Sequence, residues 1–171
     1  SGVITVNNTW ATKEADVNVI KDVVPVTQLL TTNKDAIFSG RRTAIIGHAR
    51  AKTIGTNTVG NAHPHRHKHI IGCHNGTINN FVKHGEDRSD SSVLFERLAN
   101  EDLTEVLKDA NRSGGAYALT WIDLQDNTLN FIRNDKRTLY LMYSSGNSTV
   151  YWSSEREMLD FVDKRSSMVF K

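Results

Sequence analysis

Residues 70–80 constrain the chain most, because they place Asn75 and Gly76 between two short apolar runs. An Asn-Gly pair in such a setting is typical of a β-hairpin turn, since both residues tolerate positive φ. The same pair also suits an oxyanion hole for acyl transfer, in which the Asn amide and the Gly N–H point at one spot. The hairpin is the commoner meaning, so the choice depends on whether the chain also offers a nucleophile and a substrate clamp.

The bulk composition indicates an ordinary globular protein. A length of 171 residues suits one domain with a real core. The formal net charge of +2 is too small to favour nucleic acid as a partner. The single cysteine, Cys73, excludes an internal disulfide. No apolar run approaches the roughly 20 residues of a membrane span, and no basic-then-apolar leader opens the sequence. We therefore expect a cytoplasmic protein with neither membrane nor nucleic-acid partners.

The first third of the chain predicts strands around polar loops. Residues 1–6 are rich in β-branched side chains and predict a strand. Residues 7–16 are polar and predict a loop. The mixed segment 17–38 predicts one short helix after Pro25. A buried strand is expected over residues 42–48, which would place Arg50 just past its end.

The remainder alternates helical and strand patterns. A polar cap precedes an apolar-periodic run and predicts a helix over 93–98, followed by a second helical piece over 103–110. Hairpin spacing then predicts a set of strands and a closing helix, over 116–122, 128–133, 139–143, 149–153 and 155–162. Strands, a helical middle and further strands favour an α+β layered fold.

Five residues form a set with the chemistry to bind and cleave glutamine: Ser1, Arg50, Asn75, Gly76 and Asp90. A guanidinium offers a planar fork for the α-carboxylate of glutamine, and a carboxylate accepts hydrogen bonds from its ammonium. Asn75 and Gly76 can bind the oxyanion that forms at the side-chain amide. A first residue supplies a nucleophile and, through its own α-amine, a base.

Several ordered blocks of the sequence resemble the class II glutamine amidotransferases. Residues 47–55 resemble the motif Gly-His-Thr-Arg-Trp-Ala-Thr-x-Gly of that family. Further blocks match in order, at residues 61–65, 74–80, 89–92, 115–119 and 152–155. The blocks are most similar to those of the glutaminase domain of glucosamine-6-phosphate synthases. This resemblance implies a single domain over residues 1–171 with an α+β fold. The fold would be the four-layer αββα sandwich of two antiparallel sheets of the N-terminal-nucleophile hydrolases.

The resemblance also implies roles for the residues of the site. Ser1 would occupy the nucleophile position, and Asn75 with Gly76 would form the oxyanion hole. Arg50, Thr53 and Asp90 would bind the substrate. Four histidines would support them: His48, His63, His65 and His74. The implied reaction is hydrolysis of L-glutamine to glutamate and ammonia without a cofactor, and an ammonia-accepting synthase domain or subunit would be the partner.

Two positions depart from the family pattern. Ser1 stands where the family has a cysteine, and Ala51 replaces a tryptophan. A hydroxyl is a poorer nucleophile than a thiol. An engineered Cys-to-Ser replacement, a natural serine nucleophile and a degenerate site all explain Ser1, and we favour the first because the other chemical positions are retained. The alternative function is a non-catalytic module of the same fold that binds glutamine or a partner.

A histidine run offers a less favoured alternative. His63, His65, His67 and His69 alternate, so in a strand they would share one face and could bind Zn, Cu or Ni. The plainer interpretation is that the first two pack in the fold and the others lie on a solvated edge, and we expect no metal. Cys73 lies within an apolar run and is expected to be buried, not nucleophilic.

Overall fold

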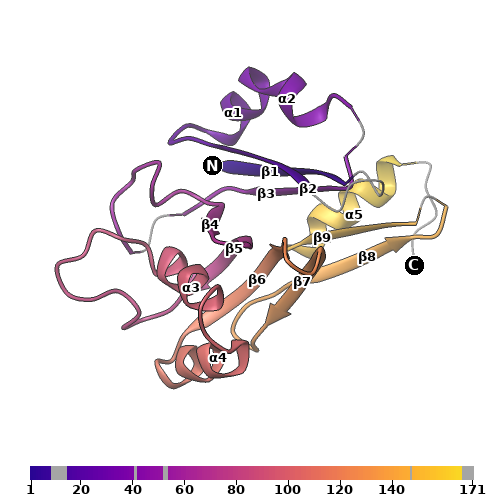
Figure 1. The fold of residues 1–171 in the computed structure, drawn as a ribbon. Coiled ribbons are helices and arrows are strands. Elements are labelled where there is room, and N and C mark those ends of the chain that lie inside the picture. Colours follow the sequence, from indigo (N-terminus) through magenta and orange to yellow (C-terminus); the bar gives the residue numbers. More distant parts are fainter. Residues whose placement is uncertain (9–14, 41, 52–53, 147, 167–171) are drawn as a thin grey trace.

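The computed structural model describes residues 1–8, 15–40, 42–51, 54–146 and 148–166. Its strands form antiparallel sheets with the orders β2-β1-β3, β4-β5-β6-β7 and β8-β9 (Figure 1). The strands are β1 Gly2–Asn8, β2 Ala15–Lys21, β3 Ala44–His48, β4 His65–His67, β5 Ile70–Thr77, β6 Ala116–Asp123, β7 Thr128–Arg133, β8 Tyr140–Ser144 and β9 Thr149–Ser153. The helices are α1 Val26–Thr32, α2 Lys34–Phe38, α3 Asp90–Leu98, α4 Leu103–Arg112 and α5 Arg156–Arg165.

Strand β1 is buried on both sides of the first sheet, since its successive side chains point to opposite faces and each face is covered. Val3 packs with Leu29 of α1 and Ile37 of α2. The next residue, Ile4, belongs to the same buried cluster as Ile71 of β5. Helices α1 and α2 therefore cover one face of the first sheet, and the second sheet packs against the other.

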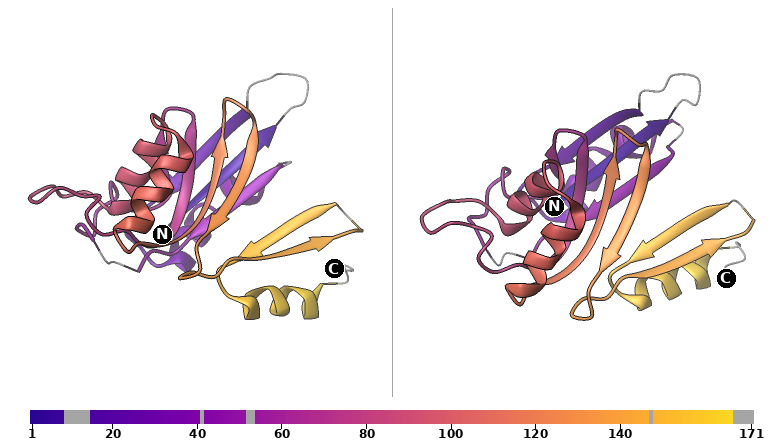
Figure 2. Two further views of the ribbon diagram at one scale, coloured as in Figure 1. Left: turned by 90° about the horizontal axis from the view of Figure 1, so that it is seen from below. Right: turned by 60° about the horizontal axis from the view of Figure 1, so that its bottom comes forward.

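The far face of the second sheet is covered by α3 and α4. Phe95 of α3 and Val106 of α4 are fully buried together with Leu119 and Trp121 of β6. Figures 1 and 2 show these two helices on the side of the second sheet that lies away from β1. The α+β class is confirmed, and the arrangement is compatible with a sandwich.

The hairpin β8–β9 and helix α5 form a more loosely attached unit. Trp152 of β9 packs on the cluster between the first two sheets and meets the ring of Phe131 edge-on, with ring centroids 5.0 Å apart. Figure 2 shows the hairpin splayed away from the second sheet. No helix in the described ranges is long and apolar enough to cross a membrane.

Two expectations for the first third of the chain are wrong. Strand β1 extends to Asn8, and the segment assigned to loop and mixed structure contains a second strand, Ala15–Lys21. The single helix expected after Pro25 is two short helices that meet at Asn33. A helix does begin directly after Pro25 as predicted, but Asn33 ends it with a non-helical φ of −112° and a second helix follows.

Of the two alternatives for Asn75–Gly76, the hairpin turn is excluded. Both residues lie inside β5, where they pair with Ala118 and Tyr117 of β6. The hairpin that the sequence did not reveal joins β4 to β5 around Lys68, whose φ is +50°. A lysine at positive φ is uncommon, so the residue types around Lys68 do not predict a turn there.

Candidate functional site

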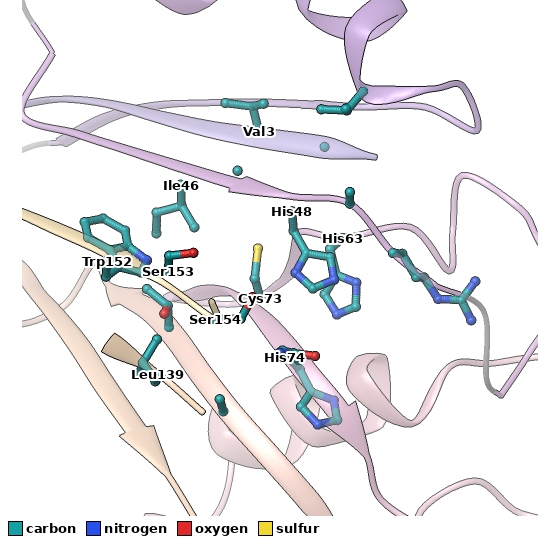
Figure 3. A pocket seen from close by; sticks show the side chains of 18 of the residues that line it. Val3, Ile46, His48, His63, Cys73, His74, Leu139, Trp152, Ser153 and Ser154 are labelled. Carbon is teal, nitrogen blue, oxygen red and sulfur yellow. The ribbon is translucent and has the colours of Figure 1, made fainter. Parts of the chain in front are cut away.

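A cleft of about 650 Å³ lies where the ends of β3 and β5 meet the start of α3. Arg50 and the sequence-predicted residues Asn75, Gly76 and Asp90 all line it. Figure 3 shows the imidazoles of His48 and His63 beside each other in this cleft, with Trp152 and Leu139 toward its other end. Thr53 lies outside the described residues.

The end of β5 requires glycine at position 76. Its φ of +153° falls in the region that favours glycine, and a Cβ there would lie 1.9 Å from the carbonyl oxygen of Ala116. The backbone of β5 therefore approaches β6 more closely than any side chain allows. Asn75 is half-buried beside it at the wall of the cleft.

The first residue lies next to this cleft. The α-amine of Ser1 donates to the carbonyl of Asp22 at 2.9 Å. Partial burial lowers the pKa of this amine, Asp22 raises it and Arg50 lowers it again. Gly2 lines the cleft, and a Cβ at Gly2 would lie 2.0 Å from the carbonyl oxygen of His63. An amine here loses its proton more readily than an exposed one, as a base near neutral pH requires.

Arg50 follows the end of β3 and reaches along the cleft. Its Nη2 donates to the carbonyl of Ile54 at 2.5 Å, so one side of the guanidinium is held by its own loop. The side chain is half-buried and lines the cleft. A fork fixed on one side is pre-organised to bind a carboxylate.

Asp90 is buried at the first turn of α3, where Ser89 is the N-cap. Its Oδ2 accepts the backbone N–H of Ile78 at 2.8 Å and lies 3.9 Å from Nδ1 of His74. His74 in turn shares a hydrogen bond of 2.9 Å with Ser91. Asp90 thus has a structural task, tying α3 to the end of β5, in addition to its place on the cleft.

A cluster of imidazoles lies at the cleft, which His48 and His63 line. The ring of His63 lies 4.1 Å from that of His48 and 4.8 Å from that of His65, centroid to centroid. Burial lowers the pKa of His48 to about 4 and that of His65 to about 3, and it holds the pKa of His63 well below the usual value. Neither ring nitrogen of His63 has a hydrogen-bond partner among the described residues. These rings are neutral at pH 7.

The alternating histidines do not all lie on one face, contrary to what the metal-site alternative requires. His65 and His67 both face α3, where they contact the hydroxyls of Ser89 and Ser92. His69 lies past the end of β4 and faces Asp123 instead, because the turn after His67 redirects the chain. Within the described ranges, no three side chains of the metal-binding types gather to hold an ion. The expected burial of Cys73 is confirmed, and burial raises the pKa of its thiol to about 12.

These neutral histidines predict a loss of stability in acid. A histidine whose pKa is lower in the folded state resists protonation there, so its contribution is full above the unfolded pKa of about 6.5 and is lost as pH falls toward the folded value. For buried His65 we expect about 2 kcal/mol to be lost by pH 4.5. Denaturant unfolding between pH 7 and 4.5 measures it. His65→Gln, which can still bond Ser89 but cannot titrate, should flatten the profile. An equally steep profile in this variant would contradict the assignment.

The cleft also contains residues that the sequence did not single out as functional. Arg137 and Leu139 precede β8, Trp152 and Ser153 end β9, and Ser154 follows it. Only tertiary packing brings the β8–β9 hairpin to this cleft. Local pattern carries no signal for that approach.

No protein-family model matches the chain. Two curated relatives are the isomerizing glutamine–fructose-6-phosphate aminotransferases of Streptococcus agalactiae serotype III and Bradyrhizobium diazoefficiens. The first is 31% identical over 149 residues, 77% of this chain and 24% of the relative. The second is 32% identical over 117 residues, 59% of this chain and 19% of the relative. The chain thus spans about a quarter or less of the length of these relatives. The resemblance noted from the sequence blocks is confirmed.

Proposed function

We propose that this chain, a relative of the glutamine–fructose-6-phosphate aminotransferases, is a glutaminase-type amidotransferase module. The module binds L-glutamine in the cleft and releases glutamate and ammonia. The observation that supports this most is the composition of that cleft, which Arg50, Asn75, Gly76 and Asp90 line beside Ser1. These groups match the carboxylate, ammonium and amide of one glutamine molecule.

In the proposed binding mode, Arg50 takes the α-carboxylate and Asp90 takes the α-ammonium. Asn75 and the N–H of Gly76 face the side-chain carbonyl, where they stabilise the oxyanion. The hydroxyl of Ser1 occupies the position of the attacking atom, with a free α-amine at residue 1 as the base. Neutral histidines support this site. Three of them line the cleft, and the fourth packs against His63: His48, His63, His74 and His65.

We propose further that residues 1–171 form one domain of the N-terminal-nucleophile hydrolase type, a four-layer αββα sandwich. The pairing of α1 and α2 with the first sheet and of α3 and α4 with the second supports this arrangement. The ammonia acceptor would be a synthase domain or subunit. A non-catalytic glutamine-binding module remains the second candidate, because Ser1 replaces the family cysteine.

Glutamine binding tests the proposal through Arg50→Lys. Lysine keeps the charge but loses the two-pronged contact, so binding should weaken by about 1–3 kcal/mol. Isothermal titration of the chain with L-glutamine measures this. Arg112→Lys, at an exposed arginine of α4, is the matched control, and this variant should bind glutamine like the parent. Absence of glutamine binding by the parent would overturn the proposal, and unchanged binding by a folded Arg50→Lys variant would remove Arg50 from the site.

A further inference from the structure

A polar network joins the loop after Arg50 to the segment that begins α3. We call it the loop clamp and define it as Thr56, Asn61, Asp87 and Ser89. Oδ1 of Asp87 accepts the backbone N–H of Thr56 at 2.8 Å, and its Oδ2 accepts the hydroxyl of Thr56 at 2.6 Å. One carboxylate thus holds both the backbone and the side chain of a residue 31 positions away.

Asn61 closes the loop clamp from the buried side. Its Nδ2 donates to the carbonyl of Thr56 at 3.2 Å, and its Oδ1 accepts the backbone N–H of Ser89 at 2.7 Å. Asn61 is only 4% exposed and Ser89 is fully buried. Both ends of the Asn61 amide are therefore used, one within the loop and the other on the α3 segment, so the side chain bridges the two.

The loop and the α3 segment also touch directly. A Cβ at Gly55, whose φ is +80°, would lie 2.8 Å from the carbonyl oxygen of Arg88. This close approach leaves no room for the loop to slide along the segment. The loop clamp fixes the relative position of two pieces of backbone that are remote in sequence.

Each of these two segments positions one of the two charged residues proposed to bind glutamine. The guanidinium of Arg50 is held by the carbonyl of Ile54, two residues before Thr56. Asp90 follows Ser89 directly and is anchored to Ile78 at the end of β5. The loop clamp thus links the loop that holds the Arg50 guanidinium to the segment that carries Asp90.

We propose that Asp87 is a positioning residue for glutamine binding, holding Arg50 at the correct distance from Asp90 through Thr56 and Asn61. This inference rests on the proposed function, because glutamine is the ligand whose two charged ends need that spacing. Asp87 itself is exposed and touches no substrate atom. An exposed aspartate without such a role contributes nothing to ligand affinity.

Asp87→Ala and Thr56→Val test this role at two levels. The first removes the whole carboxylate, including its contacts with Thr56 and Asn61, and the second removes only the 2.6 Å hydroxyl contact while keeping the side-chain shape. Titration calorimetry should show the dissociation constant for L-glutamine rising about tenfold in Asp87→Ala and about threefold in Thr56→Val. In a catalytically active form, the same variants should raise KM while kcat stays near the parental value.

Asp102→Ala provides the matched control. Asp102 is likewise an exposed aspartate that accepts two backbone N–H groups, from Thr104 and Glu105, but it caps α4 away from the cleft. It should lower the melting temperature without changing the dissociation constant. A general loss of stability would affect both aspartate variants alike, so only a change confined to Asp87→Ala supports positioning.

A double-variant cycle with Arg50→Lys separates the mechanisms. If Asp87 acts through Arg50, the effect of Asp87→Ala on the dissociation constant should shrink in the Arg50→Lys background. If the parent binds glutamine, two results would overturn this inference alone. One is full additivity of Asp87→Ala and Arg50→Lys, and the other is unchanged affinity in both Asp87→Ala and Thr56→Val. A parent that does not bind glutamine would overturn the proposed function and the positioning role together.

Discussion

Ser1→Cys is expected to raise ammonia release from glutamine by roughly 100-fold or more in a chain that begins at residue 1. A thiol is a much stronger nucleophile than a hydroxyl, and the α-amine beside it serves as the base. Burial and Arg50 lower the pKa of that amine, which increases its unprotonated fraction near pH 7. A coupled assay of glutamate or ammonia formation measures the change.

Two controls show where the gain arises. One extra residue ahead of the introduced cysteine should abolish it, because the α-amine then no longer belongs to the nucleophile. Cys73→Ser in the same background should leave it intact, because the Cys73 thiol is buried with its pKa raised to about 12. Turnover by the unmodified chain would identify Ser1 as a working nucleophile. A Cys form that binds glutamine without turnover would favour the non-catalytic module.

The sequence predicted those elements whose signals are local. The strands Thr128–Arg133 and Thr149–Ser153 have the predicted bounds, and the polar cap before α3 predicted that helix because Ser89 accepts the N–H of Ser92. Hairpin spacing and helix capping act within a few residues. Such features can be read from a single segment.

Strand β2 was missed because its evidence is not local. Alternation of apolar and polar side chains covers only residues 15–19 and breaks at Ile20, and the strand is defined by its pairing with β1, where Ile4 lies opposite Val19. The polar residues before β2 predicted a loop over residues 7–16, and that range includes the first two residues of the strand. Pairing across a sheet decides such cases, and one segment does not reveal its partner.

The site shows the same division. The residue types of the constellation could be selected from chemistry and from the family blocks. The second task of Asp90, as the acceptor for Ile78, could not, since it depends on how α3 docks on β5. The loop clamp was also hidden, because Thr56 and Asp87 look like ordinary exposed loop residues and only tertiary contact joins them.

Gly76→Ala is expected to destabilise the fold by about 3 kcal/mol or more. The added Cβ would lie 1.9 Å from the carbonyl oxygen of Ala116, which is backbone of β6 and is fixed by the strand pairing on either side. Relief requires β5 to separate from β6 at Thr77, and that movement would also displace the N–H that we propose as an oxyanion donor. Denaturant unfolding measures the free-energy loss.

Gly114→Ala is the control for placing alanine at a positive φ without a steric contact. Gly114 also has a positive φ, +72°, but a Cβ there would meet no atom within 4 Å. This control should therefore show only the backbone penalty, about 1–2 kcal/mol. The excess loss in Gly76→Ala combines the close approach between β5 and β6 with the larger backbone penalty of alanine at a φ of +153°. Equal losses in the two variants would mean that β5 can move aside freely, and the oxyanion donor would then not be fixed in place. A clear excess would show that β5 is held in place here. Weaker glutamine turnover in any Gly76→Ala protein that still folds would then show that the chemistry of the cleft depends on this part of β5.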